Sequence, residues 1–256
     1  MKSKDLSIVI VTFKSEKKIF NCLNSISSNV DVLIVENSNN KNFKSHIEEK
    51  YANVKCFLTG GNKGYAVANN IGLKKVNTKY ALVLNPDTIL NKNAIDNFLI
   101  TAKKFQDFWL IGPANNQSIS YQFQNNNINE VDNLKGFAIF FNLSKFNNNF
   151  FDENFFLYFE EIDLCKNVKK KKGKIYLDKN IVINHEGGSS VDKTKSLELE
   201  KNRNWHWMWS TFYFNRKYKG FFIALIFIFP KLISSLLKII FYQLILDNKK
   251  KNYLFL

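Results

Sequence analysis

The chain has 256 residues and 45% of them are hydrophobic, which is enough for one large domain with a substantial core and an appended segment. Its 37 Lys and Arg against 22 Asp and Glu give a net charge of +15, so we expect a partner that carries phosphate or another anionic group. Cys22, Cys56 and Cys165 have neither metal-ligand nor redox spacing, which argues against a disulfide framework and indicates a reducing compartment. No signal peptide is expected, because the first apolar run, residues 6–11, is short and has the composition of a strand.

Strand and helix patterns alternate in the first part of the chain. Apolar and β-branched runs, typical of strands buried on both faces, occupy residues 6–12, 31–35, 54–58 and 80–84. Segments with helical spacing of apolar residues separate them, at residues 17–26, 43–51 and 65–75. This alternation predicts an α/β fold with a Rossmann-like, mostly parallel sheet flanked by helices.

Polar residues follow these predicted strands. Thr12 ends the first strand, Glu36 and Asn37 follow the second, a Gly-Gly-Asn-Lys-Gly loop at residues 60–64 follows the third, and Asp87 follows the fourth. Because parallel strands end at one sheet edge, these groups would line one crevice and would suit a base, a ribose and phosphates. Taken singly, Asp87 is explained equally well as a helix cap, and Glu36 as a solvated loop acid.

The second half of the chain departs from this alternation. We expect a helix at residues 95–105, strands at 109–112 and 134–142, a mobile Asn-rich loop at 115–133, and a hairpin formed by 174–177 and 181–184. Glu160, Glu161 and Asp163 follow a strongly aromatic stretch. One explanation is that these acids lie in the first turn of a helix and are stabilised by the helix dipole. The other is that one of them is a general base whose pKa is raised by an apolar pocket. His185 is either structural or a metal ligand.

Six segments, in order between residues 6 and 190, carry a resemblance to a known family. They are Ser-Ile-Val-Ile-Val-Thr at 7–12, Val-Glu-Asn-Ser at 35–38, the Asn-Lys-Gly-Tyr stretch at 62–72, Leu-Asn-Pro-Asp-Thr at 84–88, the acid-rich stretch at 151–164, and His185. Together they resemble the inverting nucleotide-sugar glycosyltransferases of glycosyltransferase family 2, which have the GT-A fold. Within that family they resemble most the rhamnosyltransferase-like proteins of bacterial surface polysaccharide assembly.

The resemblance implies a role for individual residues. Glu36 stands where the family has an aspartate that contacts the base and ribose, and Glu161 stands where it has the base that deprotonates the acceptor. Asp87 and His185 match the ligands of a divalent metal, Mn²⁺ or Mg²⁺, on the diphosphate. Asp163 belongs to the same acidic segment and is predicted to be catalytic with Glu161. The residues expected to contact the nucleotide sugar are Thr12, Glu36, Asn37, Asn62, Lys63, Gly64, Asn85 and Asp87.

Three positions depart from the family pattern. Asn85 replaces the usual first acid of the metal-binding motif, and Glu36 and Glu161 are each one methylene longer than the usual aspartate. A shift of that size costs activity if the pocket does not adjust. These departures keep open the alternative of a catalytically inactive, transferase-like scaffold.

The resemblance implies transfer of a sugar from a UDP or dTDP donor, with rhamnose as the candidate, by one displacement that inverts the anomeric centre. The expected acceptor is a glycan or a lipid-diphosphate-linked sugar in cell-surface polysaccharide synthesis. A nucleotidyltransferase is the weaker enzyme alternative, because no basic glycine-rich signature lies near the amino terminus. A basic nucleic-acid-binding protein is the non-enzyme alternative, but no nucleic-acid-binding motif is present and we expect no nucleic acid partner.

We predict two domains, a GT-A domain at residues 1–192 and a helical extension at 193–256. The extension mixes aromatic and basic residues at 194–219 and is very apolar at 221–246, where only Lys231 and Lys238 interrupt it. This pattern favours a helix that lies in the cytoplasmic face of the inner membrane. The alternatives are a single spanning helix, or a helix packed on the catalytic domain or on a partner.

Overall fold

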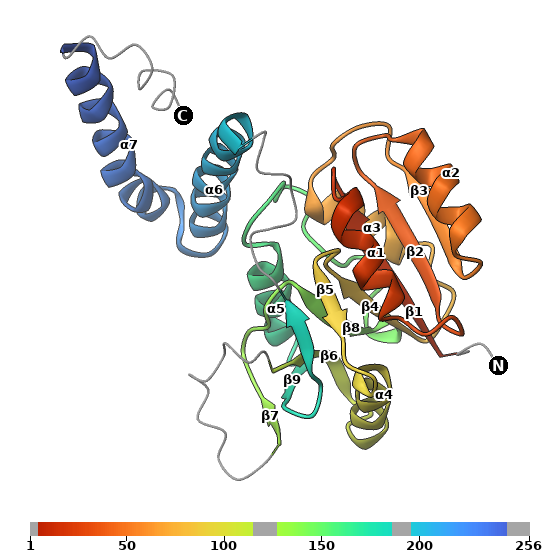
Figure 1. Cartoon of the computed structure of the whole chain (residues 1–256). Coiled ribbons are helices and arrows are strands. Elements are labelled where there is room, and N and C mark those ends of the chain that lie inside the picture. The colour runs from red at the N-terminus through yellow and green to blue at the C-terminus, as the bar shows by residue number, and fades with distance from the viewer. Residues whose placement is uncertain (1–4, 115–126, 186–195, 245–256) are drawn as a thin grey trace. The chain divides into compact units, whose positions relative to one another are not determined.

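The computed structural model describes residues 5–114, 127–185 and 196–244 (Figure 1). The chain divides into two compact units. The first contains the described residues up to Glu153 and those from Glu160 to His185, and the second contains Asn154–Phe159 together with the described residues from 196 onward. The predicted domain boundary between residues 192 and 193 lies outside the described residues. The short segment Asn154–Phe159, which we expected in the GT-A domain, groups instead with the C-terminal helices.

An eight-stranded sheet in the order β3-β2-β1-β4-β8-β6-β9-β7 forms the centre of the first unit. Its strands are β1 (Leu6–Thr12), β2 (Asp31–Glu36), β3 (Val54–Leu58), β4 (Tyr80–Leu84), β6 (Phe108–Pro113), β7 (Ile128–Glu130), β8 (Ala138–Asn142) and β9 (Lys174–Asp178). The first four are parallel, while β8 runs antiparallel to both β4 and β6. The predicted α/β fold with a mostly parallel sheet is therefore confirmed.

Helices cover both faces of this sheet, since successive strand residues point to opposite faces. Ile8 and Ile10 of β1 pack into one apolar cluster with residues of three helices, α1 (Glu16–Asn24), α2 (Lys41–Lys50) and α4 (Ala94–Lys104). Val9 packs into a second cluster with residues of α3 (Tyr65–Leu73) and α5 (Glu160–Lys170). A 3₁₀ turn, Leu143–Lys145, follows β8. The double covering explains why the strands lack a polar face.

Two local predictions for the second half were wrong. The residues predicted as a hairpin form strands in different sheets: β9 joins the large sheet, whereas β10 (Ile183–His185) pairs antiparallel with β5 (Thr88–Leu90). The predicted mobile loop at 115–133 contains β7, which pairs with β9, and its residues 115–126 lie outside the described residues. Long-range pairing decided both cases, and a local pattern does not report it.

The second unit contains α6 (Ser196–Lys219) and α7 (Phe221–Leu244), joined at Gly220, whose φ of +94° favours glycine. The two predicted helices are thereby confirmed. Within this unit α6 holds the segment Asn154–Phe159: Ser210 Oγ donates to Leu157 O at 2.8 Å, and the His206 ring stacks on Phe156 at 4.0 Å. The residue after this segment, Glu160, is the first residue of α5.

Helix α7 presents a large apolar surface. Only Ala224 and Ile228 of its described side chains are buried, and Lys231 lies over the Trp207 ring of α6 at 3.1 Å. Its exposed apolar residues are Phe221, Phe222, Ile223, Leu225, Ile226, Phe227, Phe229, Leu232, Ile233, Leu236, Leu237 and Ile240. The sequence left open a membrane-spanning helix, but none of the helices in the described parts of the chain is both long and apolar enough to cross a bilayer.

Candidate active site

The strand register brings the predicted site residues to one edge of the sheet. Thr12 at the end of β1 pairs with Glu36 at the end of β2, and Glu36 pairs in turn with Leu58 at the end of β3. On the other side of β1, Ile10 pairs with Leu84, so Asn85 leaves β4 at the same edge. Carboxyl ends of adjacent parallel strands are where open α/β sheets bind ligands.

Asn37 ties the end of β2 to the glycine loop. Its Oδ1 accepts from Lys63 N at 2.9 Å and Thr59 Oγ1 at 3.1 Å, and its Nδ2 donates to Asn62 Oδ1 and to Gly64 O. The side chain is 2% exposed. With all of its hydrogen-bonding capacity used, Asn37 fixes the loop, while Asn62 and Lys63 themselves are exposed at the edge.

The carboxylate of Glu36 is likewise occupied by hydrogen bonds within the protein. It is 1% exposed, and its carboxylate accepts from Ser38 N, Ser38 Oγ and Asn40 N, the last at 2.7 Å. The side chain predicted to contact the base and ribose is thus turned into its own loop. Thr12 Oγ1, by contrast, is buried without a hydrogen-bond partner among the described residues.

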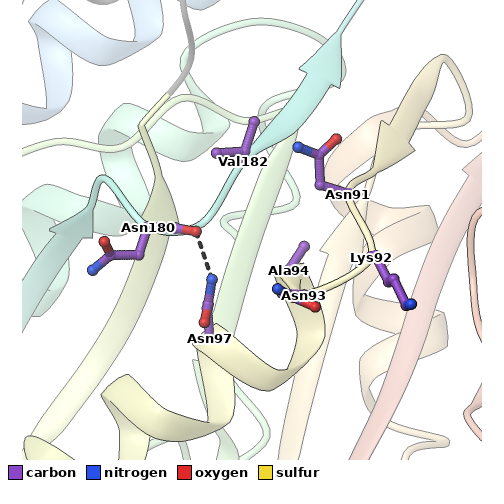
Figure 2. Close-up of a pocket in the computed structure, with 7 residues that line it drawn as sticks. All are labelled: Asn91, Lys92, Asn93, Ala94, Asn97, Asn180 and Val182. Carbon is purple, nitrogen blue, oxygen red and sulfur yellow. Dashed lines mark hydrogen bonds between the residues drawn. The ribbon is translucent and has the colours of Figure 1, made fainter.

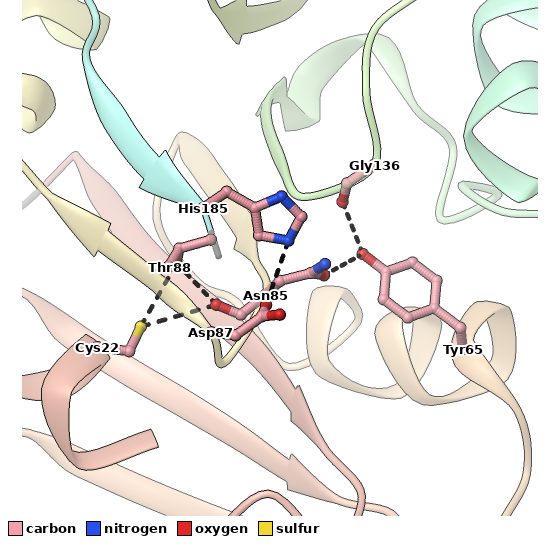
Figure 3. A network of polar contacts seen from close by, with 7 residues as sticks. All are labelled: Cys22, Tyr65, Asn85, Asp87, Thr88, Gly136 and His185. Atoms are coloured by element: carbon pink, nitrogen blue, oxygen red, sulfur yellow. Dashed lines mark hydrogen bonds and ion pairs between the residues drawn. The ribbon is translucent and has the colours of Figure 1, made fainter. Parts of the chain in front are cut away.

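Asp87 and His185, from distant parts of the sequence, lie side by side. The ladder of β5 and β10 pairs Thr88 with His185, which places His185 Nε2 3.3 Å from Asp87 Oδ1 (Figure 3). The His185 ring stacks on Phe137 with centroids 4.8 Å apart. The close approach does not meet hydrogen-bond geometry, since Asp87 Oδ1 is buried and has no hydrogen-bond partner among the described residues.

This pair fits the divalent cation that the resemblance implies. A buried carboxylate oxygen that lacks a donor is costly unless something positive binds it, and carboxylate oxygens suit Mn²⁺ and Mg²⁺. The described residues hold no group of three or more His, Cys, Asp or Glu side chains around a metal position. A site with few protein ligands suits a cation that is also held by phosphate oxygens.

The turn after β4 is fixed by contacts with Thr88 and with Cys22 of α1. Thr88 Oγ1 donates to Asn85 O at 2.7 Å, and the buried Cys22 thiol lies 3.7 Å from Thr88 Oγ1 (Figure 3). Burial raises the pKa of Cys22 to about 12, so the thiol stays protonated at neutral pH. These contacts fix the direction in which Asn85 and Asp87 leave the strand.

A short segment that the sequence analysis treated as strand, Gly136-Phe137, joins the parts of the site. Phe137 O accepts from Asn85 N at 2.9 Å, and Gly136 O accepts from Tyr65 Oη at 2.9 Å. A Cβ added at Gly136 would lie 3.5 Å from the Glu161 side chain. Tyr65, Gly136 and Phe137 were not predicted as site residues, because none belongs to a residue type that performs the chemistry.

The three acids of α5 differ in environment. Asp163 is fully buried and accepts from Asn167 Nδ2 at 2.8 Å, so its side chain has no exposed surface for an acceptor. Glu161 is partly exposed, and burial raises its pKa. Glu160, which belongs to the predicted acidic segment but was not among the residues predicted to be catalytic, is 3% exposed, and its Oε2 has no partner among the described residues. Burial and the charge of Glu161 raise the pKa of Glu160 to about 8.

A separate pocket of about 460 Å³ lies at the other end of the β5–β10 ladder (Figure 2). It is lined by Asn91, Lys92, Asn93, Ala94, Asn97, Asn180 and Val182. Asn97 Nδ2 donates to Asn180 O at 2.6 Å across it. Its lining contains one charged side chain and no carboxylate or imidazole, so it lacks the chemistry assembled at Asp87 and His185.

The fold and this sheet edge define the class of protein, a GT-A glycosyltransferase. The model of the family described as "Glycosyl transferase family 2" matches residues 7–164, more than half of the chain, and the chain belongs to that family. The low-salt glycan biosynthesis hexosyltransferase Agl10 of Haloferax volcanii is 28% identical over 221 residues, which cover 75% of this chain and 69% of that protein.

Solved structures show the same fold. The mannosyltransferase PcManGT of Pyrobaculum calidifontis, in complex with GDP-Man and Mn²⁺, aligns with a TM-score of 0.60 at 11% identity, covering 89% of this chain and 72% of that one. Residues 1–349 of S. aureus TarS, in complex with UDP, align with a TM-score of 0.54 at 19% identity, covering 68% of this chain and 57% of that one. The chain therefore spans little more than half of the TarS structure.

Proposed function

We propose that the protein is an active, inverting glycosyltransferase that uses a nucleoside-diphosphate sugar. The observation that carries this is the convergence of Asp87, His185 and Glu161 around Asn85 and Gly136-Phe137, although Glu161 is far from Asp87 in sequence. Such a convergence is what a two-sided displacement needs, with one group for the leaving diphosphate and another for the attacking hydroxyl. A buried carboxylate oxygen without a hydrogen-bond donor, as in Asp87 and Glu160, costs stability, which favours a role in activity over a scaffold without activity.

In the proposed mechanism, Asp87 and His185 are the residues that would hold a divalent cation, and such a cation would supply positive charge to the leaving diphosphate. The glycine loop at residues 60–64, fixed by Asn37, presents exposed Lys63 at the same edge for the donor. Glu161 takes the proton of the acceptor hydroxyl as that oxygen attacks the anomeric carbon. Its raised pKa brings it closer to the range in which a carboxylate serves as a base near neutral pH. The acceptor oxygen and the leaving diphosphate lie on opposite faces of the sugar, so the configuration inverts.

Donor and acceptor complete the proposal. PcManGT and TarS were solved with GDP-Man and UDP, and we propose a UDP or dTDP sugar here, with rhamnose as the candidate from the branch resemblance. The acceptor is proposed to be a glycan or a lipid-diphosphate-linked sugar of the cell envelope. The hexosyltransferase relative acts in glycan biosynthesis, which supports an acceptor of that class.

Thermal unfolding with UDP, dTDP and GDP, each with and without Mn²⁺, tests this proposal. A nucleotide at 100 times its dissociation constant adds about 2.7 kcal/mol of stability, which is readily measured. We expect a Mn²⁺-dependent shift with one nucleotide that disappears in Asp87→Ala. The control Asp96→Ala, which removes an exposed acid of the same unit, should keep the shift. No shift with any nucleotide would return us to the scaffold alternative.

We also propose that α7 binds the surface of an anionic membrane, which suits a lipid-linked acceptor. The apolar face described above follows directly after three cations in the last turn of α6, Arg216, Lys217 and Lys219. Apolar side chains beside cations match the apolar interior and the anionic headgroups of a bilayer surface. The expected location is the cytoplasmic face of the inner membrane.

Sedimentation with phosphatidylglycerol and phosphatidylcholine vesicles tests this membrane proposal. The variant Phe222→Ser/Ile226→Ser/Phe229→Ser removes side chains that are 79%, 68% and 60% exposed, and should weaken binding to phosphatidylglycerol roughly a hundredfold. Ile100→Ser changes an equally exposed side chain, 60%, on α4 and serves as the control. Equal binding of the triple variant and the wild type would exclude α7 as the lipid-binding element.

A further inference from the structure

The hydroxyl of Tyr65 lies between two polar groups of the site (Figure 3). Tyr65 Oη is 2.9 Å from Gly136 O and 3.2 Å from the side-chain amide atom of Asn85 that is placed as Oδ1. A phenol carries one hydrogen and therefore donates one hydrogen bond. Two oxygen acceptors at these distances would leave one contact without a hydrogen.

Hydrogen accounting resolves the orientation of the Asn85 amide. Gly136 O is a carbonyl and only accepts, so the Tyr65 hydrogen goes to this shorter contact. The Asn85 amide can then contact Tyr65 Oη only as a donor, which means through Nδ2. The nitrogen and oxygen of an amide are assigned from such networks. Asn85 Oδ1 then points away from Tyr65.

Among the described residues, no other group forms a hydrogen bond with the second amide atom of Asn85, the oxygen Oδ1 in this orientation. The side chain of Asn85 makes one hydrogen bond there, to Tyr65, and it is partly exposed. Figure 3 shows the amide between the Tyr65 hydroxyl and the Asp87–His185 pair. The backbone of Asn85 is fixed on both sides, because its N donates to Phe137 O and its O accepts from Thr88 Oγ1.

We propose that Tyr65 is a positioning residue that turns Asn85 Oδ1 toward Asp87 and His185, so that Asn85 is a neutral oxygen ligand for the metal and diphosphate. This inference rests on the proposed function. It accounts for a site in which Asn85 replaces an acid and no third acidic, histidine or cysteine ligand is present among the described residues. Amide oxygens are suitable ligands for hard divalent cations.

Electron paramagnetic resonance of free Mn²⁺ measures the metal affinity directly, without turnover. The full chain is titrated with Mn²⁺ at saturating UDP, and with dTDP or GDP if UDP does not bind. Tyr65→Phe should weaken Mn²⁺ binding about fivefold, the effect of one neutral hydrogen bond. Tyr51→Phe is the matched control, since Tyr51 Oη also contacts an asparagine, Asn24 Oδ1 at 2.8 Å, at an exposed position. It should leave the affinity unchanged.

The same measurement in an Asn85→Ala background separates positioning from a general structural role. If Tyr65 acts through Asn85, Tyr65→Phe adds no further loss once the amide is gone. An equal loss in both backgrounds, or no loss when Tyr65→Phe is made in the otherwise wild-type chain, would overturn the inference. If the wild type binds no Mn²⁺ with any nucleotide, the proposed function fails together with the inference. If the wild type binds Mn²⁺ but Tyr65→Phe binds it equally well, only the inference fails.

Discussion

Two buried glutamates at the site differ in the number of hydrogen-bond donors that surround their carboxylates. Glu36, in the turn after β2, is 1% exposed and accepts from Ser38 and Asn40. Glu160, at the start of α5, is 3% exposed and has an oxygen with no partner among the described residues. A carboxylate whose two oxygens both accept hydrogen bonds organises the backbone around it, whereas a buried carboxylate with one oxygen that lacks a donor favours its protonated form. In the proposed mechanism, Glu36 therefore fixes the backbone on the nucleotide-sugar donor side, and proton transfer is assigned to the α5 side.

Glu161→Gln should have the largest effect on the α5 side. It keeps the shape of the side chain and removes the base, so turnover should fall by about 10²- to 10⁴-fold. The Mn²⁺-dependent thermal shift with nucleotide should persist, because the donor side is untouched. Glu130→Gln, an exposed acid of β7, is the control and should retain activity. Wild-type turnover in Glu161→Gln would remove Glu161 from the mechanism.

Glu160 should make the stability of the protein depend on pH. Its folded-state pKa of about 8 is above the ordinary value of 4.5, so the folded state binds more protons between these two pH values. Stability should therefore fall as the pH rises through this window, by up to about 1.4 kcal/mol per pH unit.

Glu160→Gln is the corresponding variant and should remove that slope. The free energy of unfolding in urea, measured at pH 5, 6, 7 and 8, checks this prediction. The stability of the variant should exceed that of the wild type by the largest amount at pH 8. A wild-type slope that survives in Glu160→Gln would assign the effect to another group.

Glu36→Gln should destabilise the donor side, in contrast to Glu160→Gln. The amide offers one acceptor where the carboxylate offers two, and its NH₂ faces the donors of Ser38 and Asn40. The loss should be about 2 kcal/mol, in the range for hydrogen bonds to a charged group. Urea denaturation at pH 7 measures it, with Glu49→Gln on the exposed surface of α2 as the control. A loss no larger than the control's would show that the contacts of Glu36 add little.

Ser38→Ala should have the smallest effect, about 1 kcal/mol, because it removes one donor and leaves the backbone N–H groups of Ser38 and Asn40. Combined with Glu36→Gln, it should cost less than the sum of the two single variants, because both disturb one network. Additive losses would mean that the Ser38 hydroxyl acts elsewhere.

The strands and their polar ends were predictable because each is recorded locally, in apolar runs that stop at polar residues. The proximity of Asp87 and His185 depends on the pairing of β5 with β10. The sequence pattern instead predicted that residues 181–184 pair with residues 174–177. Tyr65 and Gly136-Phe137 could not be found from their residue types, because they act through contacts between distant segments. The saturation of Glu36 and the missing partner of Glu160 are likewise properties of the folded environment, although the two residues look alike in sequence.

Transfer of a sugar with inversion, as proposed, is tested by the anomeric configuration of the product that is released first. With water as acceptor, hydrolysis of UDP-GlcNAc or dTDP-rhamnose in Mn²⁺ can be followed by proton nuclear magnetic resonance of the anomeric signals. We expect that the wild type releases the inverted anomer first, and that Asp87→Ala releases it much more slowly. Release of the retained anomer, or equal rates for wild type and Asp87→Ala, would contradict it.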